Sequence, residues 1–298
     1  NMKKFTGFLL FGLLLLTLGF GTLTLQSAQN ALSIWFEKLV PSMFLSMVLV
    51  RLLYKEHAFD HLPSLGLPAL LGMDQGAWNL VLCTMFLGFP TGSVFVDEAV
   101  RDGVLSRQDA ARLLYCCCFP TPGFVIISCG IVFFKSLHIG MLLFALQLLS
   151  GLLLLLFTRR HTVHTFPAAV ASSQSFMRNL SSAVTESGIS LYMIGGYLML
   201  FMSVTAVLFS FLPEFPALII RSLAEFSSGI VLINVTPFST MQRLLLTSFL
   251  LGFAGFCVHM QIMSMVEQVP LRYPVFLLYR ILQGMISVLL LILCVQFL

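Results

Sequence analysis

Charged residues are scarce in this chain. Only 9% of its 298 residues are Asp, Glu, Lys or Arg, whereas 58% are hydrophobic and the mean hydropathy is +0.99. A soluble protein needs far more charge to cover its surface, so soluble enzymes and nucleic-acid binders are disfavoured. The composition instead predicts an all-α polytopic membrane protein.

Cysteine pairs with metal-ligand spacing are also missing. All seven cysteines lie in apolar stretches, and none belongs to a Cys-x-x-Cys motif. This pattern predicts small buried hydrophobic residues and excludes a disulfide framework or a cysteine-based metal site. We therefore expect no cofactor other than a coupling cation, Na⁺ or H⁺.

Apolar segments and breaks divide the chain into two halves with the same order of elements. The expected parts are an N-terminal transmembrane helix (1–30), repeat 1 (31–158), a cytoplasmic linker (159–178) and repeat 2 (179–298). Each repeat is predicted to contain a plain span, an interrupted segment, an interrupted span and a second plain span. These are 33–54, 77–101, 108–134 and 138–157 in repeat 1, and 183–212, 216–235, 242–266 and 275–298 in repeat 2.

Two interruptions carry most of the information. The first is Gly88-Phe89-Pro90-Thr91-Gly92-Ser93, and the second is Glu225-Phe226-Ser227-Ser228-Gly229. Irregular backbone at membrane depth is tolerated only where it is buried in protein or lines a cavity. We therefore predict two re-entrant helical hairpins with tips at 88–93 and 225–229. The alternative for the first tip is a proline kink packed against a neighbouring helix.

The positive charges predict an orientation. If the N-terminus is cytoplasmic and both hairpins leave on the side they enter, twelve of the 16 Lys and Arg residues fall at or near the inner face of a cell membrane. This asymmetry is what the positive-inside rule expects. Each repeat then makes three full crossings, which places the C-terminus outside and makes the structural repeat inverted.

Paired broken helices in inverted repeats are typical of secondary transporters. A helix that begins inside the membrane presents unpaired N–H groups and a partial positive charge, which suits an anion or a carbonyl oxygen. Glycines are expected to let a solute approach the backbone, and hydroxyls to bind it. The predicted binding residues at the tips are Gly88, Pro90, Thr91, Gly92, Ser93, Ser227, Ser228 and Gly229.

The interrupted spans supply a second pair of breaks. Prolines in the first break remove backbone donors, so the carbonyls upstream of them are candidates to coordinate a cation. The residues assigned to binding in these breaks are Pro120, Thr121, Gly123, Gly255 and Gln261. Four breaks meeting near the midplane predict a polar pocket in an apolar body.

Glu225 is the strongest single candidate, because an ionisable side chain at membrane depth is expensive and functional by default. We expect Glu225 and His259 to couple an ion or a proton to transport. The alternatives are a helix-surface ion pair between Glu225 and Arg221, and a hydrogen-bonded interhelical role for His259. The charged run 97–102 is predicted to form a solvated end of the first hairpin.

Several of these motifs occur together in one known group. Gly88 to Gly92 match a Gly-aromatic-Pro-x-Gly tip, and Pro120 to Gly123 match a Pro-Gly break. In the second half, Glu225 and Gly229 match a Glu-x-x-x-Gly tip, while Gly252, Gly255 and Gln261 match a Gly-rich break ending in Gln. The chain thereby resembles the YlbJ-type sporulation integral membrane proteins, which belong with the Gate-domain proteins and are related to concentrative nucleoside transporters. The resemblance implies a transporter fold and, for one branch, passage of dipicolinic acid.

These patterns favour a secondary-transporter-like carrier, not an enzyme, that moves a small polar metabolite by alternating access. An anion such as dipicolinate is the preferred solute. The alternatives are a nucleoside or other small-solute carrier and a non-transporting membrane assembly or regulatory protein, with an intramembrane serine hydrolase using Ser93 and His259 ranked last. The expected partners are the solute and the lipid bilayer; a homo-oligomer is left open, and nucleic acid is not expected.

Overall fold

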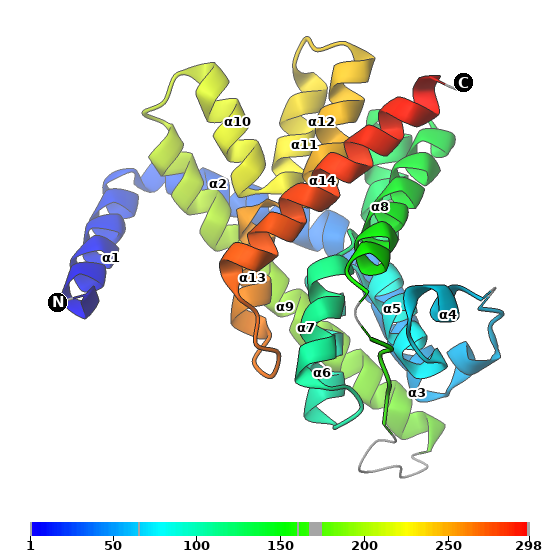
Figure 1. The fold of residues 1–298 in the computed structure, drawn as a ribbon. Coiled ribbons are helices and arrows are strands. Elements are labelled where there is room, and N and C mark those ends of the chain that lie inside the picture. The colour runs from blue at the N-terminus through cyan, green and yellow to red at the C-terminus, as the bar shows by residue number, and fades with distance from the viewer. Residues whose placement is uncertain (1, 65, 160, 167–174, 297–298) are drawn as a thin grey trace.

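The computed structural model describes residues 2–64, 66–159, 161–166 and 175–296. Regular structure in these residues is helical apart from two isolated β-bridges, which confirms the all-α prediction. The first half contains α1 (Met2–Gly19), α2 (Gly21–Ser33), the π-helix η1 (Ile34–Leu39), α3 (Val40–Lys55), the 3-10 helix η2 (Ala58–His61), α4 (Leu67–Leu71), α5 (Gln75–Leu87), α6 (Thr91–Arg101), α7 (Arg107–Cys116), the π-helix η3 (Gly123–Phe133) and α8 (Leu137–Phe157). The second half contains α9 (Phe176–Phe209), α10 (Glu214–Ala224), α11 (Phe226–Val235), α12 (Thr240–Phe253), α13 (Gly255–Met265) and α14 (Tyr273–Gln296) (Figure 1).

Several helical stretches are long and apolar enough to cross a membrane. Four of them are Leu137–Phe157, Phe176–Phe209, Thr240–Met265 and Tyr273–Cys294. A fifth candidate is a bent pair, Lys4–Gly19 with Gly21–Lys55, whose axes differ by 92°. These spans support a multi-pass membrane protein, and the orientation of its termini stays a prediction.

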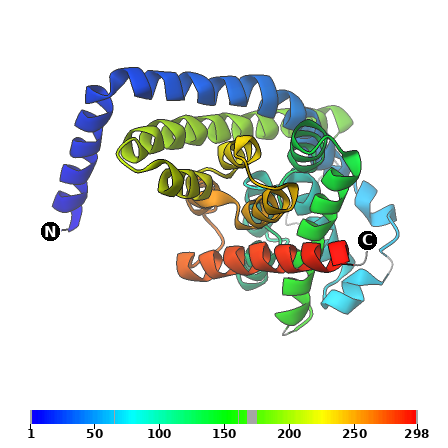
Figure 2. The same ribbon diagram turned by 90° about the horizontal axis from the view of Figure 1, so that it is seen from above.

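The N-terminal helix ends earlier than the sequence predicts. The sequence predicts an N-terminal helix within 1–30 and a separate span from residue 33, but α1 ends at Gly19 and the next helix runs without a gap from Gly21 to Lys55. Two glycines flank the bend, and glycine weakens a helix by roughly 1 kcal/mol relative to alanine. Figure 2 shows α1 turning away from the long helix that follows. The expected boundary at residue 30 therefore falls inside a helix.

The start of the linker is attached to the first half. The N–H of Val163 donates to Gly72 O at 2.8 Å, and the N–H of Phe166 donates to Val104 O at 2.9 Å. The Asp74 carboxylate accepts the N–H of Thr165 at 2.6 Å. Residues 160 and 167–174 of the predicted linker lie outside the described residues, and 176–178 already belong to α9.

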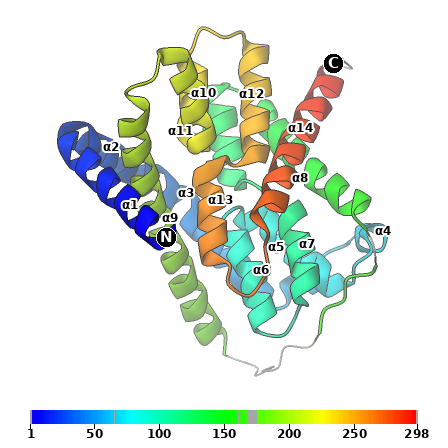
Figure 3. The same cartoon turned by 60° about the vertical axis from the view of Figure 1, so that its left-hand side comes forward.

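Both predicted interruptions end one helix and begin another that packs back on it. In the pair α5–α6, a Cβ on Gly92 would lie 3.0 Å from Thr84 Cα; in the pair α10–α11, a Cβ on Gly229 would lie 2.4 Å from Ser222 Cα. Figures 1 and 3 show the first hairpin in the lower part of the molecule and the second in the upper part. The two helical hairpins are thus present; their re-entry into a membrane stays a prediction.

The interrupted spans also break near the predicted positions. Residues 117–122 separate α7 from η3, and Ala254 alone, at φ 72°, separates α12 from α13. One core of buried side chains joins the halves, since Leu80, Leu113 and Phe119 share it with Val258 and Phe276. Each half contains a helical hairpin and an interrupted span, in that order. The relation of the halves as an inverted repeat stays a prediction.

Candidate functional site

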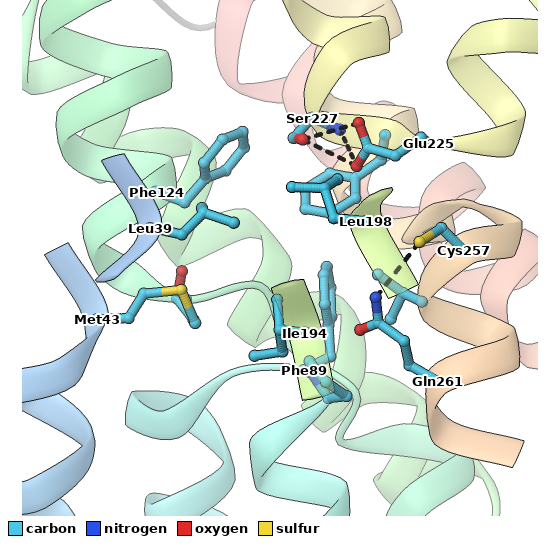
Figure 4. Close-up of a pocket in the computed structure, with 14 residues that line it drawn as sticks. Leu39, Met43, Phe89, Phe124, Ile194, Leu198, Glu225, Ser227, Cys257 and Gln261 are labelled. Atoms are coloured by element: carbon cyan, nitrogen blue, oxygen red, sulfur yellow. Dashed lines mark hydrogen bonds between the residues drawn. The ribbon is translucent and has the colours of Figure 1, made fainter. Parts of the chain in front are cut away.

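The four breaks meet around one cavity of about 50 Å³ (Figure 4). The hairpin tips contribute Phe89, Pro90, Glu225, Phe226 and Ser227, the interrupted spans contribute Thr121, Phe124, Cys257, Val258 and Gln261, and the plain helices contribute Leu39, Met43, Ile194 and Leu198. Figure 4 shows Glu225 and Ser227 on one side of the cavity and Phe89 and Gln261 on the other. The sequence predicts a polar pocket, but most of the lining side chains are apolar.

Aromatic rings connect the two hairpin tips. The Phe89 and Phe226 rings are edge-to-face with centroids 5.2 Å apart, and the Phe124 and Phe226 centroids are 5.3 Å apart. Edge-to-face pairs of this kind are favourable beyond the area that they bury. The tips of hairpins far apart in sequence are therefore in direct contact.

Glu225 caps the N-terminus of α11. Its exposed fraction is 4%, and its carboxylate accepts the N–H of Ser227 at 3.0 Å and of Ser228 at 2.6 Å. The Ser227 hydroxyl lies 2.8 Å from both carboxylate oxygens. A negative charge is favoured at this end of a helix. The protein's own carboxylate thus occupies the N–H groups that the sequence assigns to a solute.

The alternative ion pair between Glu225 and Arg221 is not formed. Glu225 is buried and turned toward the serines, and Arg221 makes no ion pair within the described part of the chain. Glu225 is therefore not an interfacial, surface-exposed acid. Its predicted role in ion or proton coupling stays a prediction.

The first tip is built differently. Gly88 has φ +67°, and a Cβ there would lie 2.6 Å from the backbone nitrogen of Thr121. The N–H of Phe89 donates to Phe119 O at 2.7 Å. The Thr91 hydroxyl is buried and has no hydrogen-bond partner among the described residues. The glycine therefore lets the tip pack closely against the first break.

Arg280 occupies carbonyls of the first break. This side chain of α14 is fully buried; its Nη1 donates to Cys118 O at 2.8 Å and its Nη2 donates to Tyr115 O. The guanidinium carbon also lies 5.3 Å from the centroid of the Phe276 ring. The sequence predicts that these carbonyls coordinate a cation, and the structure supplies an arginine from the second half instead. Burying a guanidinium requires such partners.

His259 lies behind the cavity wall and does not line it. Its Nε2 is 2.7 Å from Phe253 O, and its ring packs against aromatic neighbours with centroid distances of 4.9 Å to Phe253 and 5.3 Å to Phe276. This geometry matches the alternative of a hydrogen-bonded interhelical histidine. No hydrogen bond joins His259 to Ser93 among the described residues, and a hydrolase role for the pair gains no support.

Gln261 offers the cavity an unpaired polar atom. Its exposed fraction is 3%, its Nε2 is 3.3 Å from Cys257 Sγ, and its Oε1 has no partner within the part of the chain that the structure describes (Figure 4). Leaving a buried acceptor unpaired costs about 1–3 kcal/mol. A donor that enters the cavity, from water or from a solute, satisfies this oxygen.

The structure places five of the predicted residues on the cavity wall, namely Pro90, Thr121, Glu225, Ser227 and Gln261. The others lie outside the lining: Gly88, Thr91, Gly92, Ser93, Pro120, Gly123, Ser228, Gly229, Gly255 and His259. Glycine at 255 serves close packing, because a Cβ there would lie 2.9 Å from Phe226 N. Binding by any of these residues stays a prediction.

Sequence reasoning missed most of the apolar wall. Phe89, Phe124 and Phe226 stand within or next to the breaks, so their position was a usable signal. Met43 and Ile194 belong to plain helices, and nothing in the sequence separates them from lipid-facing or core positions. Only the packing of α3 and α9 against the tips assigns them to the wall.

The end of the first hairpin is only partly solvated, whereas the sequence predicts a solvated end. Asp97 is 8% exposed, and its carboxylate accepts the N–H groups of Glu267, Gln268 and Val269 at 3.2, 2.7 and 3.0 Å. A carboxylate with three backbone donors ties α6 to the loop between α13 and α14. Within the charged run, the side chains of Arg101 and Asp102 remain exposed.

An ion network continues from the same hairpin end. Arg51 is fully buried, and its Nη1 lies 2.8 Å from Glu98 and 2.8 Å from Glu186. Lys55 is also 2.8 Å from Glu186. The network joins α3, α6 and α9, so it connects the first hairpin to the first long helix of the second half.

Comparison with known proteins supports part of the resemblance. The chain is 25% identical to the sporulation integral membrane protein YlbJ of Bacillus subtilis (strain 168) over an alignment 305 residues long, gaps included. The alignment covers 87% of this chain and 74% of that protein. No family model matches the chain, and no solved structure matches it. The similarity supports a YlbJ-type integral membrane protein, as predicted. The relationships to Gate-domain proteins and nucleoside transporters stay predictions.

Proposed function

We propose that the chain is a membrane carrier that moves a small solute by alternating access, with the cavity between the four breaks as its binding site. The observation that carries the proposal is the contact of two helical hairpin tips through Phe89 and Phe226, both of which line one cavity. Broken helices that converge from both halves of a membrane protein are the usual construction of a transporter's binding site.

The preferred solute is a small anionic metabolite with a flat ring, such as dipicolinate. The rings of Phe89, Phe124 and Phe226 present edges and faces to the cavity. A flat ring packs favourably against such surfaces, while the unpaired Gln261 oxygen and the Ser227 hydroxyl supply polar atoms on opposite sides of the cavity. A nucleoside has the same combination of a flat ring and polar edges, and it is the alternative solute.

Glu225 sets the condition under which an anion binds. A solute carboxylate in this cavity lies close to the Glu225 carboxylate, and like charges repel strongly where water is scarce. A proton or a Na⁺ ion that enters with the solute removes this repulsion. We therefore assign the coupling of solute and cation to Glu225.

A second function is favoured by the size of the cavity. At about 50 Å³ it is much smaller than the sites of roughly 300–1,000 Å³ that hold typical small ligands. A carrier whose binding site has closed after release of the solute has such a small cavity. A non-transporting assembly or regulatory membrane protein has the same closed interior permanently, so transport has to be measured directly.

The decisive experiment is solute uptake by the purified full chain in lipid vesicles. Dipicolinate and a nucleoside are tested separately, with and without an inward H⁺ or Na⁺ gradient. We expect dipicolinate uptake that rises with one gradient, and a Glu225→Gln variant that loses this dependence. Glu37→Gln is the matched control, because Glu37 is an exposed carboxylate whose side chain accepts from Ser33.

Each outcome assigns one function. Uptake of the nucleoside but not of dipicolinate identifies the nucleoside as the solute and leaves the proposed binding site unchanged. Absence of uptake for both, with a thermal midpoint showing folded protein, contradicts the carrier and favours the assembly or regulatory function.

A further inference from the structure

Arg221 is a cation without an ion-pair partner in the part of the chain that the structure describes. It is half-buried on α10, one turn before the tip of the second hairpin, and its Nε is buried without a hydrogen bond. It makes no ion pair within the described part of the chain, and the nearby Glu225 carboxylate is already bonded to Ser227 and Ser228. An unpaired charge withdrawn from water is unfavourable unless a ligand supplies the opposite charge.

The Arg221 side chain lines a second, larger cavity. This cavity has a volume of about 640 Å³ and lies at the open end of the second hairpin, between the end of α9, α10 and the end of α11. Its wall includes the rings of Phe209 and Phe215 and the hydroxyls of Ser210 and Thr236. It shares no lining residue with the central cavity. It is therefore a separate site.

The chemistry of the wall selects the ligand. A guanidinium has five donors in a planar fork that fits a carboxylate or a phosphate with two parallel hydrogen bonds. The hydroxyls of Ser210 and Thr236 already donate to Val207 O and Leu232 O, which leaves Arg221 as the main donor. The remaining wall is largely apolar, and Val235 beside it is 78% exposed. The ligand thus combines an oxyanion with an apolar body.

We propose that this cavity binds a phosphate or carboxylate group through Arg221, with an attached apolar group covering the exposed wall. A phospholipid headgroup and a free oxyanion share the recognising chemistry. The site does not depend on the central cavity being a transport site, because the two cavities are lined by different residues.

Thermal unfolding of the purified full chain in neutral detergent tests the site. The thermal midpoint is followed during titration with inorganic phosphate, and in separate micelles containing phosphatidylglycerol or, as the neutral lipid, phosphatidylcholine. Binding to the folded state raises the midpoint by mass action. The chain is compared with Arg221→Gln, Arg221→Lys and the control Arg243→Gln, since Arg243 already donates to Asn234 O at 3.3 Å.

We expect one anionic ligand to raise the midpoint of the unmodified chain and of Arg243→Gln. Arg221→Gln should need about tenfold or more of that ligand for the same rise, because a hydrogen bond to a charged group is lost. Arg221→Lys should fall between them, since it keeps the charge and loses the fork. Dependence on phosphatidylglycerol identifies a lipid headgroup, and dependence on inorganic phosphate identifies a free oxyanion.

Without a ligand, Arg221→Gln should be at least as stable as the unmodified chain, because it removes an uncompensated cation. Equal midpoint shifts in the unmodified chain and Arg221→Gln for every anion would overturn the proposal. A thermal midpoint that falls in Arg221→Gln by the same amount in detergent alone and in each lipid would also overturn the proposal.

Discussion

The first hairpin is held at its open end, whereas the second is held at its tip. Asp97 and Glu98 bind the end of α6 to the loop before α14 and to Arg51, and no comparable carboxylate caps the tip between α5 and α6. In the second hairpin, Glu225 caps the tip, and the open end borders a cavity of about 640 Å³ beside Arg221, which forms no ion pair with the residues that the structure describes.

This difference indicates which hairpin can move. Charged side chains withdrawn from water resist rearrangement, because breaking one pair leaves the other charge uncompensated. Elements with fewer such contacts open at lower free energy. We therefore expect the first hairpin to behave as part of the core, and the second hairpin to be the element that moves during alternating access.

The largest expected effect comes from Arg51→Met. The substitution leaves Glu98 without its partner and Glu186 with Lys55 alone, and removing one member of a buried ion network costs about 3–5 kcal/mol. A strong fall of the thermal midpoint in detergent is expected. Arg101→Met is the control, because Arg101 is largely exposed and its contact with Asp102 is 3.7 Å. Equal thermal midpoints for the two variants would show that the ion network does not stabilise the open end of the first hairpin.

Gly88→Ala comes next, with an expected destabilisation of about 2–3 kcal/mol, since it adds steric conflict to an unfavourable φ. A Cβ at Gly88 meets Thr121 backbone, whereas Gly103 has φ +75° with nothing within 4 Å of a Cβ. Gly103→Ala therefore measures the cost of φ alone, about 1–2 kcal/mol. If both variants lose the same stability in chemical unfolding, the first tip is not packed against the break as described.

The smallest expected effect concerns the contact between the tips. In a double-mutant cycle of Phe89→Leu and Phe226→Leu, we expect a coupling energy of about 0.5–1.5 kcal/mol from the edge-to-face pair. Phe36→Leu with Phe226→Leu is the reference cycle, because Phe36 is exposed and makes its ring contact with Trp35. A coupling energy near zero in the first cycle would show that the tips do not support each other.

The positions of the helices were largely predictable because hydrophobic length and helix-breaking residues act locally. The helices are interrupted at the prolines and glycines of 88–92 and 120–123, although α7 already ends at Cys116, and the span predicted at 138–157 corresponds to α8 at 137–157. The N-terminal bend was missed because glycines at 19 and 21 are tolerated in many membrane helices. Their effect depends on whether neighbouring helices support the segment.

The site was only partly predictable. Position beside a break brought Thr121, Ser227 and Gln261 to the cavity wall. Arg280 could not be assigned, because its carbonyl partners at 115 and 118 lie more than 160 residues away in sequence. The sequence singles out Glu225, and the structure places it on the cavity wall, where its bonds to the serines depend on the capped geometry of α11.

Composition and the placement of proline, glycine and charge determine that the chain is a helical membrane protein with four interruptions. They do so because bilayer thickness and backbone hydrogen bonding act on each segment separately. Which polar groups satisfy those interruptions depends on contacts between segments distant in sequence. Packing places Arg280 on one set of carbonyls, and it places Arg221 in a cavity where it has no ion-pair partner among the described residues. A pattern along the chain does not contain these two placements, because each of them forms only when the helices have docked.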